Sequence, residues 1–184
     1  MSVLTRLRRP VVGAPMAGGP STPQLAVAVS QAGGLGFLAG GMCPVSRLRD
    51  DVARVRAGTD QPFGVNLFLP GDPAVDDAAI EAYAARLAPT AARWEVPLGH
   101  PTGGDDDYPA KLDALLADPV PVVSFVFGLP GADEVAALRA RGSEVWATVT
   151  SPAGAVEAVE RGVDVLVVQG TEAGGHRGGV RDDD

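Results

Sequence analysis

The sequence predicts an α/β fold in which short parallel strands alternate with amphipathic helices. Six short runs are mostly apolar at both odd and even positions, which is typical of strands that are covered on both faces. The order helix, glycine, charged residue and strand also recurs, most clearly at 134–145 and 155–165, as expected for repeated βα units. No linker with a shift in composition divides the chain, so we expect a single domain over residues 1–184.

Each predicted strand is bounded by glycine, proline or polar residues that favour turns. The six strands are expected at 11–16, 35–39, 63–68, 120–127, 144–149 and 163–168.

The predicted helices carry an apolar face and begin or end with residues that favour helix termini. They are expected at 22–31, 45–57, 74–87, 132–140 and 151–161. Thr22 is a candidate N-cap before a proline at the first helical position. In the last helix, Val156 and Val159 are expected to point inward. Residues 89–109 lack such a pattern and are interpreted as an irregular excursion near the rim of the sheet.

Composition excludes several classes of function. The chain has a net charge of −8 and no basic stripe, which argues against nucleic acid and anionic membranes as partners. No apolar stretch approaches the length of a membrane span, and we expect no signal peptide. The single cysteine, Cys43, rules out an internal disulfide framework and favours a cytoplasmic protein. No Cys/His cluster has the spacing of a metal site.

A glycine-rich turn with one histidine follows the last predicted strand. It reads Glu-Ala-Gly-Gly-His-Arg-Gly-Gly over residues 172–179 and contains His176. Glycines let backbone N–H groups approach a ligand and point at phosphate or carbonyl oxygens. A histidine held over such a site can abstract a proton near neutral pH. His176 is therefore the candidate catalytic base; the alternative is a surface histidine in a flexible turn.

Polar side chains also lie at the carboxyl ends of other predicted strands. Gln169 follows the last strand, and Asn66 lies near the end of the third. A side-chain amide can meet both a donor and an acceptor of a heterocycle, and these strand ends face the active side of a barrel. The alternative for both residues is a hydrogen-bonded strand end. Met16 lies in a Pro-Met loop with glycines that closes the first strand, while Ser124 and Thr148 are interpreted as core residues with satisfied hydroxyls.

Taken together, these motifs resemble the nitronate monooxygenase family, formerly the 2-nitropropane dioxygenases. The resemblance rests on Gln-Gly-Thr-Glu-Ala-Gly-Gly-His-Arg-Gly at 169–178, Gly-Ala-Pro-Met at 13–16 and Gly-Val-Asn-Leu-Phe at 64–68. Segments 123–128 and 146–152 are similar to inner strands of that family. The resemblance therefore extends in order over nearly the whole chain.

The resemblance implies a fold, a cofactor and a reaction. The fold would be a flavin-binding TIM (β/α)8 barrel, here incomplete with about six βα units, since a closed barrel needs eight. The cofactor would be FMN, with no metal, and the reaction would be oxidation of alkyl nitronates by O₂. His176 matches the position of the family's catalytic base. The residues implied to contact or line the flavin are Met16, Asn66, Gln169, Gly174 and Gly175.

Two other functions remain open at this point. The Glu-Ala-Gly-Gly-His string also occurs in FMN-dependent enoyl-[acyl-carrier-protein] reductases, so the motif indicates the flavin fold better than the substrate. The second alternative is a non-catalytic truncated fragment, because the family's phosphate-binding loops come from the last two βα units, which this sequence does not contain. The oligomeric state is open too, with a homo-oligomer as one alternative.

Overall fold

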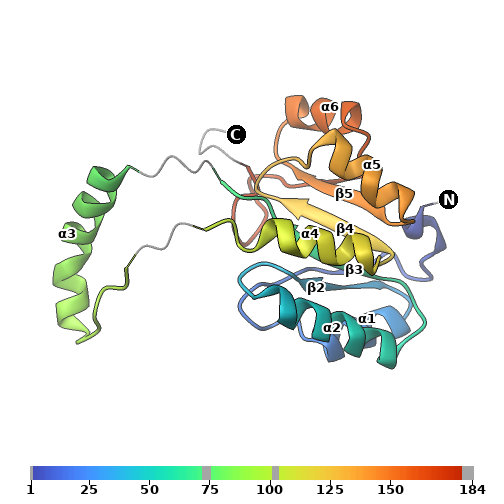
Figure 1. The fold of residues 1–184 in the computed structure, drawn as a ribbon, viewed down its shortest axis with the longest axis horizontal. Helices are drawn as coiled ribbons and strands as arrows, with labels where there is room; N and C mark the ends of the chain where they lie inside the picture. Colours follow the sequence, from blue (N-terminus) through green and yellow to red (C-terminus); the bar gives the residue numbers. More distant parts are fainter. Residues whose placement is uncertain (1, 72–75, 101–103, 180–184) are drawn as a thin grey trace.

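In a computed structural model, the chain forms one curled sheet of six parallel strands with most of its helices on its outer side, while the helix Asp77–Arg93 stands apart from the sheet (Figure 1). The structure describes residues 2–71, 76–100 and 104–179. The strands pair in sequence order, and every neighbouring pair is parallel, as expected for successive βα units. The strands are β1 (Val12–Gly13), β2 (Leu35–Ala39), β3 (Phe63–Phe68), β4 (Val122–Val126), β5 (Glu144–Val149) and β6 (Val165–Val168).

The helices follow the strands in alternation, except that two helices separate β3 from β4. Their bounds are η1 (Val3–Arg6, a 3-10 helix), α1 (Pro23–Gln31), α2 (Val45–Gly58), α3 (Asp77–Arg93), α4 (Tyr108–Ala117), α5 (Ala132–Ala140) and α6 (Pro152–Glu160). The predicted N-cap is confirmed, because the Thr22 side chain accepts a hydrogen bond from the backbone N–H of Leu25.

The prediction of an irregular excursion over 89–109 is wrong at both of its ends. α3 continues through Pro89 to Arg93, because a proline removes a single backbone donor and need not end a helix. α4 begins at Tyr108. Residues 74 and 75 of the predicted helix 74–87 lie outside the described residues. The first strand is also shorter than predicted, because only two of its residues pair with β2.

Apolar side chains pack on both faces of the sheet. The larger cluster lies between the sheet and the helices and includes Val65, Phe125 and Leu138. The inner face carries a smaller cluster of Val3, Leu35, Phe37, Val122 and Trp146. Because successive side chains of a strand point to opposite faces, the same strands build both layers.

The inner face is closed at the amino ends of the strands by the N-terminal segment. The Glu144 carboxylate accepts hydrogen bonds from the Ser2 hydroxyl at 2.7 Å, the Val3 N–H at 2.7 Å and the Trp146 indole at 2.8 Å. These bonds hold the N-terminal segment in place, so that the Val3 side chain is buried within the inner cluster. The opposite end of the inner face, at the carboxyl ends of the strands, carries the loops with the candidate site residues.

The last helix and strand expose apolar side chains that were expected to be covered. The prediction that Val156 and Val159 point inward is wrong: their exposed fractions are 59% and 61%. Val168 of β6 is exposed by 77%. β6 is one of the two edges of the sheet, and these exposed fractions show that no described helix or strand covers the three valines. No described helix is both long and apolar enough to cross a membrane.

Candidate functional site

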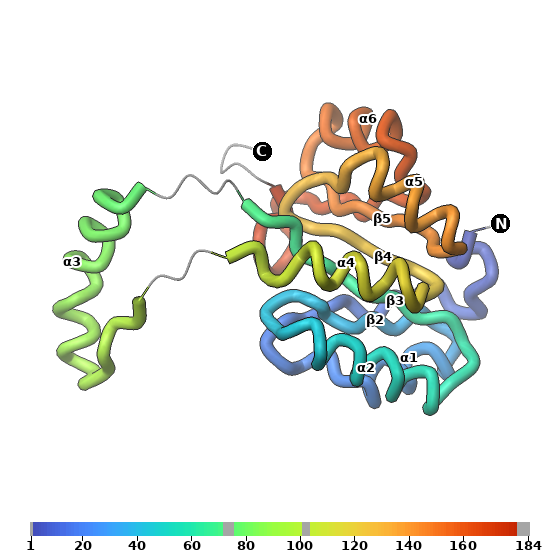
Figure 2. The backbone as a smooth tube through the Cα atoms, viewed as in Figure 1, coloured from blue at the N-terminus to red at the C-terminus, as the bar shows by residue number. Residues whose placement is uncertain are grey.

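The predicted site residues lie in or after strands at the carboxyl edge of the sheet. In Figure 2 the red C-terminal loop lies at the same end of the sheet as the carboxyl ends of β3 and β4, opposite the N-terminus. A backbone hydrogen bond joins the two regions, because the Phe127 N–H donates to the Gly178 carbonyl at 3.2 Å. The loop after β6 therefore returns across the sheet as far as the end of β4.

Gln169 holds this returning loop through both groups of its side-chain amide. Its Nε2 donates to the His176 carbonyl at 2.8 Å, and its Oε1 accepts from the Gly178 N–H at 2.6 Å. Gly178 is buried, and a Cβ at this position would lie 2.7 Å from Thr148. Only glycine fits there without displacing a neighbour. The structure thus gives Gln169 a defined role in shaping the loop that carries His176.

The side chain of His176 packs at the end of a short aromatic row. Its ring lies edge-on to Phe127 with the centroids 6.2 Å apart, and Phe127 lies edge-on to Phe68 at 4.9 Å. Phe127 has φ of 67°, a left-handed conformation that is uncommon for a bulky residue. Such conformations persist where the surroundings enforce them, as they do at many functional sites. His176 is exposed at this edge, so a substrate can reach it.

Asn66 lies deeper, on the inner face of β3. Its Nδ2 donates to the Ser124 hydroxyl at 2.9 Å and to the Ser124 carbonyl at 3.3 Å. Both side chains are buried, with exposed fractions of 4% and 5%. The prediction that Ser124 is a core residue with a satisfied hydroxyl is confirmed. The hydrogen bonds of the Asn66 side chain to described residues use its Nδ2 donor, and its Oδ1 acceptor takes part in none of them.

Met16, Gly174 and Gly175 lie on the surface at the carboxyl edge of the sheet. Met16 is exposed by 43%, and its N–H donates to the Ser21 hydroxyl at 2.7 Å, which fixes the loop after β1. A Cβ added at Gly174 or at Gly175 would meet no atom within 4 Å. Gly175 has φ of 86°, which strains any residue with a side chain. The loop at Gly174 and Gly175 therefore borders open space, where its backbone N–H groups can point at a ligand.

The structure brings the predicted residues together in two groups. Gln169 and His176 form one group at the β6 end, and Asn66 pairs with Ser124 between β3 and β4. Met16 follows β1, at the other edge of the open sheet from β6, so it does not contact His176. Sequence reasoning missed Phe68 and Phe127. Each is the last aromatic residue of an apolar strand run. That position could have indicated a side chain at the carboxyl edge of the sheet, which we call the mouth.

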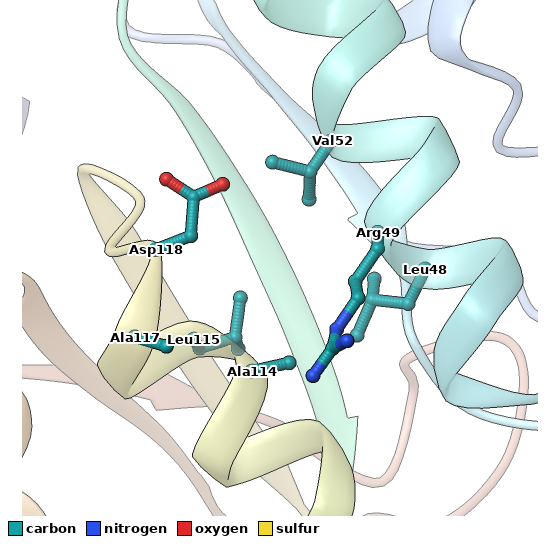
Figure 3. Close-up of a pocket in the computed structure, with 7 residues that line it drawn as sticks. All are labelled: Leu48, Arg49, Val52, Ala114, Leu115, Ala117 and Asp118. Carbon is teal, nitrogen blue, oxygen red and sulfur yellow. The ribbon is translucent and has the colours of Figure 1, made fainter.

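A separate hollow on the outer surface lies away from this edge. It is a groove of about 340 Å³ between α2 and α4 (Figure 3). Leu48 and Val52 line it from α2, and Arg49 and Asp118 border it. None of the predicted site residues lines this groove, so it is not the candidate site.

Comparison with known proteins gives a consistent picture for nearly the whole chain. Residues 2–184 match the family model described as nitronate monooxygenase. A nitronate monooxygenase from Paraburkholderia phytofirmans is 41% identical over 182 residues, which is 95% of this chain and 49% of that protein. The crystal structure of nitroalkane oxidase from Streptomyces ansochromogenes superimposes with a TM-score of 0.91 at 48% identity, covering 98% of this chain and 51% of that one.

A second solved structure is similar at a greater distance. The M276A mutant of FabK from Thermotoga maritima has a TM-score of 0.68 at 29% identity and covers 95% of this chain. In all three cases the chain spans about half the length of the protein it matches. The similarity therefore concerns about half of the length of each relative.

Proposed function

The chain belongs to the nitronate monooxygenase family, and from this premise we propose that it supplies six of the eight βα units of an FMN-dependent barrel that oxidises alkyl nitronates and nitroalkanes with O₂. The observation that carries the proposal is the loop after β6. Gln169 folds it over the strand ends so that His176 is exposed at the edge where barrel enzymes bind substrate. Because the chain spans half of its relatives, the activity is proposed for the barrel completed by its remaining units.

His176 would act as a general base towards a neutral nitroalkane. The imidazole would accept the proton from the carbon next to the nitro group, and the electrons of that C–H bond would form the carbon–nitrogen double bond of the nitronate. Phe127 limits the positions that the ring can adopt, and Gln169 fixes the backbone on both sides of Arg177. A positioned base of this kind contributes typically about 10²–10⁴-fold to a rate. A preformed nitronate has already lost this proton and would need His176 only for binding.

The residues at the mouth fit a flavin in part. The Oδ1 acceptor of Asn66 and the open space around Gly174 and Gly175 suit a flat heterocycle with donors and acceptors on its edge. The Met16 side chain would supply an apolar contact from the β1 side. Both amide groups of Gln169 are engaged within the loop, so its contact with FMN would require a change in these bonds. When bound, FMN supplies the electron transfer, and the protein supplies orientation and proton handling.

The anchor for the flavin phosphate is expected elsewhere. In TIM barrels that bind phosphate, the site is frequently formed by the loops after the seventh and eighth strands. The structure describes six strands, and the relatives are about twice as long as this chain. We therefore propose that the phosphate is held by the part of the barrel that follows β6.

The experiment that tests this function compares two oxidations in the completed protein. We expect O₂ uptake with propionate 3-nitronate and no NADH oxidation that depends on an enoyl thioester. The opposite pattern would establish the enoyl reductase alternative. Absence of both activities in a folded, FMN-loaded protein would establish the non-catalytic alternative.

A further inference from the structure

Lys111 is a buried cation that the proposed reaction does not use. Its side chain is exposed by 1%, and it lies in the first two turns of α4, near the helix N-terminus. The helix dipole disfavours a positive charge at this end, and burial of any charge is costly unless the charge is paired. The position of Lys111 therefore needs a specific compensating partner.

That partner is Asp106, which also binds a second segment of the chain. Lys111 Nζ lies 2.9 Å from Asp106 Oδ2 and also donates to the Asp106 carbonyl. The other carboxylate oxygen, Oδ1, accepts a hydrogen bond from the Met42 N–H at 2.9 Å. Met42 lies in the loop between β2 and α2, which we call the β2–α2 loop and which comprises residues 40–44. One carboxylate thus joins the start of α4 to this loop.

The backbone on both sides of this contact is strained. Met42, Asp106 and Asp107 have φ of 59°, 56° and 54°, and none of them is glycine. Non-glycine residues in the left-handed region persist where surrounding structure enforces the conformation, frequently at functional sites. The ion pair between Lys111 and Asp106, with the bond of Asp106 to Met42, provides that constraint here.

The β2–α2 loop contacts the strand that carries Asn66. The Gly40 N–H donates to the Asn66 carbonyl at 2.7 Å. A Cβ at Gly41 would lie 2.5 Å from the ring of Phe68, so the loop backbone packs directly on that ring. Phe68 packs on Phe127, which packs on His176. A continuous series of contacts therefore leads from Lys111 to the candidate base.

We propose that Lys111 and Asp106 are positioning residues that clamp the β2–α2 loop against Phe68 and so set the shape of the substrate-binding mouth. The clamp itself follows from the contacts above. Its role towards a substrate rests on the proposed function. The two claims are tested by separate measurements.

The clamp is tested by labelling Cys43, the single cysteine of the chain, which lies inside the β2–α2 loop. Asp106→Ala should accelerate its reaction with a thiol reagent by about tenfold, because hydrogen bonds to charged groups are among the stronger ones. Lys111→Met should accelerate it too. Burial raises the pKa of the Cys43 thiol, the Lys111 charge lowers it and the Asp106 charge raises it. Removing Lys111 without opening the loop would therefore slow labelling, whereas removing Asp106 speeds it through charge alone. Acceleration in Lys111→Met is the result that distinguishes an opened clamp from a charge effect.

A double variant and a control variant show whether the change in labelling is specific to the clamp. The double variant should label no faster than Asp106→Ala alone, because both changes remove one clamp. Arg139→Met breaks an ion pair with Asp164 at the other end of the sheet and should leave labelling unchanged. If Lys111→Met does not fold, Asp106→Glu takes its place, because it keeps the charge but displaces the carboxylate by one methylene and should accelerate labelling only by loosening the loop. Wild-type rates in the folded variants, or equal acceleration by Arg139→Met, would overturn the clamp.

The role towards substrate is tested in the completed, FMN-loaded protein with Asp106→Asn. We expect the KM for a nitronate to rise by about tenfold while kcat changes little, because the clamp shapes the substrate-binding mouth without joining the chemistry. Accelerated labelling with an unchanged KM would overturn this role. An inactive wild-type protein would contradict the proposed function and leave the labelling result intact.

Discussion

Gln169 and His176 lie seven residues apart and are joined by the side-chain amide of one and the backbone carbonyl of the other. The same amide accepts a bond from Gly178, so the segment 176–178 is held at both of its ends. Loops that carry catalytic residues need such support, because a small displacement of a base can cost a large part of the rate. Both residues can be tested singly.

Replacing the candidate base should separate two substrates. His176→Asn in the completed protein should slow turnover of neutral nitroalkanes by about 10²–10⁴-fold, because proton abstraction loses its acceptor. Turnover of preformed nitronates should fall much less. Steady-state O₂ uptake on both substrates measures the difference, and His100→Asn, at the other histidine of the chain, serves as the control. Equal losses on both substrates would assign His176 to binding or to support of the flavin.

Removing the amide that anchors the loop should loosen it locally. Gln169→Leu keeps the volume but removes two hydrogen bonds, each worth about 1 kcal/mol. We expect faster hydrogen exchange at residues 176–178, weaker flavin binding in the completed protein, and no change at β3 or β4. Gln31→Leu is a matched control, because the Gln31 amide also bonds a distant carbonyl, that of Gly58. Unchanged exchange in Gln169→Leu would show that the loop is held by other contacts.

At the scale of the elements, α4 is joined to the sheet by a tyrosine with an unusual environment. The Tyr108 ring packs 6.4 Å from Phe125 of β4, and its hydroxyl is buried without a hydrogen-bond partner among the described residues. Burial is the main cause that raises the pKa of this phenol far above its ordinary value, and the nearby Glu134 carboxylate adds to it. The neutral phenol is therefore strongly favoured in the folded state. The hydroxyl does not meet the donor–acceptor geometry of a hydrogen bond with that carboxylate, so it is unsatisfied among the described residues.

Replacing this tyrosine should stabilise the fold. Tyr108→Phe removes an unsatisfied buried hydroxyl and should raise the free energy of unfolding by about 1 kcal/mol at neutral pH. In the wild type, stability should fall as the pH rises above about 10, where the phenol ionises only in the unfolded chain. Tyr108→Phe should lack this part of the alkaline loss. Denaturant unfolding at several pH values checks both effects, with the exposed Tyr83→Phe as control. Destabilisation by Tyr108→Phe would mean that the hydroxyl has a stabilising partner.

The bounds of a strand were predicted well where its apolar run lies between clear turn signals. Strands such as β3 and β5 have the predicted bounds, because buried parallel strands are short apolar runs between clear turn signals. α4 was missed because an acidic stretch and Pro109 precede an apolar segment too short to show a clear period. Within the site, the amides at 66 and 169 were expected, but their partners were not. The partners of Gln169 depend on a loop that returns from β6 to the end of β4, and the Asn66–Ser124 pair depends on the register between β3 and β4. No local pattern encodes either of these.

At the scale of the whole molecule, the sheet is an open part of a barrel with two edges, β1 and β6. The chain has six parallel strands in order, and it covers about half of each relative. β6 and α6 expose valines that a neighbouring βα unit would cover in a closed barrel. Exposed apolar strand edges favour association of chains. We therefore expect the 184-residue chain alone to self-associate and to bind flavin weakly.

The most direct test measures bound flavin and nitronate oxidation in two proteins. One is the 184-residue chain alone, and the other is this chain joined to the C-terminal half of the Paraburkholderia phytofirmans relative. We predict that the joined protein contains FMN, released by heat and identified by chromatography, and consumes O₂ with propionate 3-nitronate. The chain alone should contain little flavin and show little turnover. A soluble, yellow, monomeric 184-residue chain with normal turnover, or a joined protein that releases only FAD, would contradict the account.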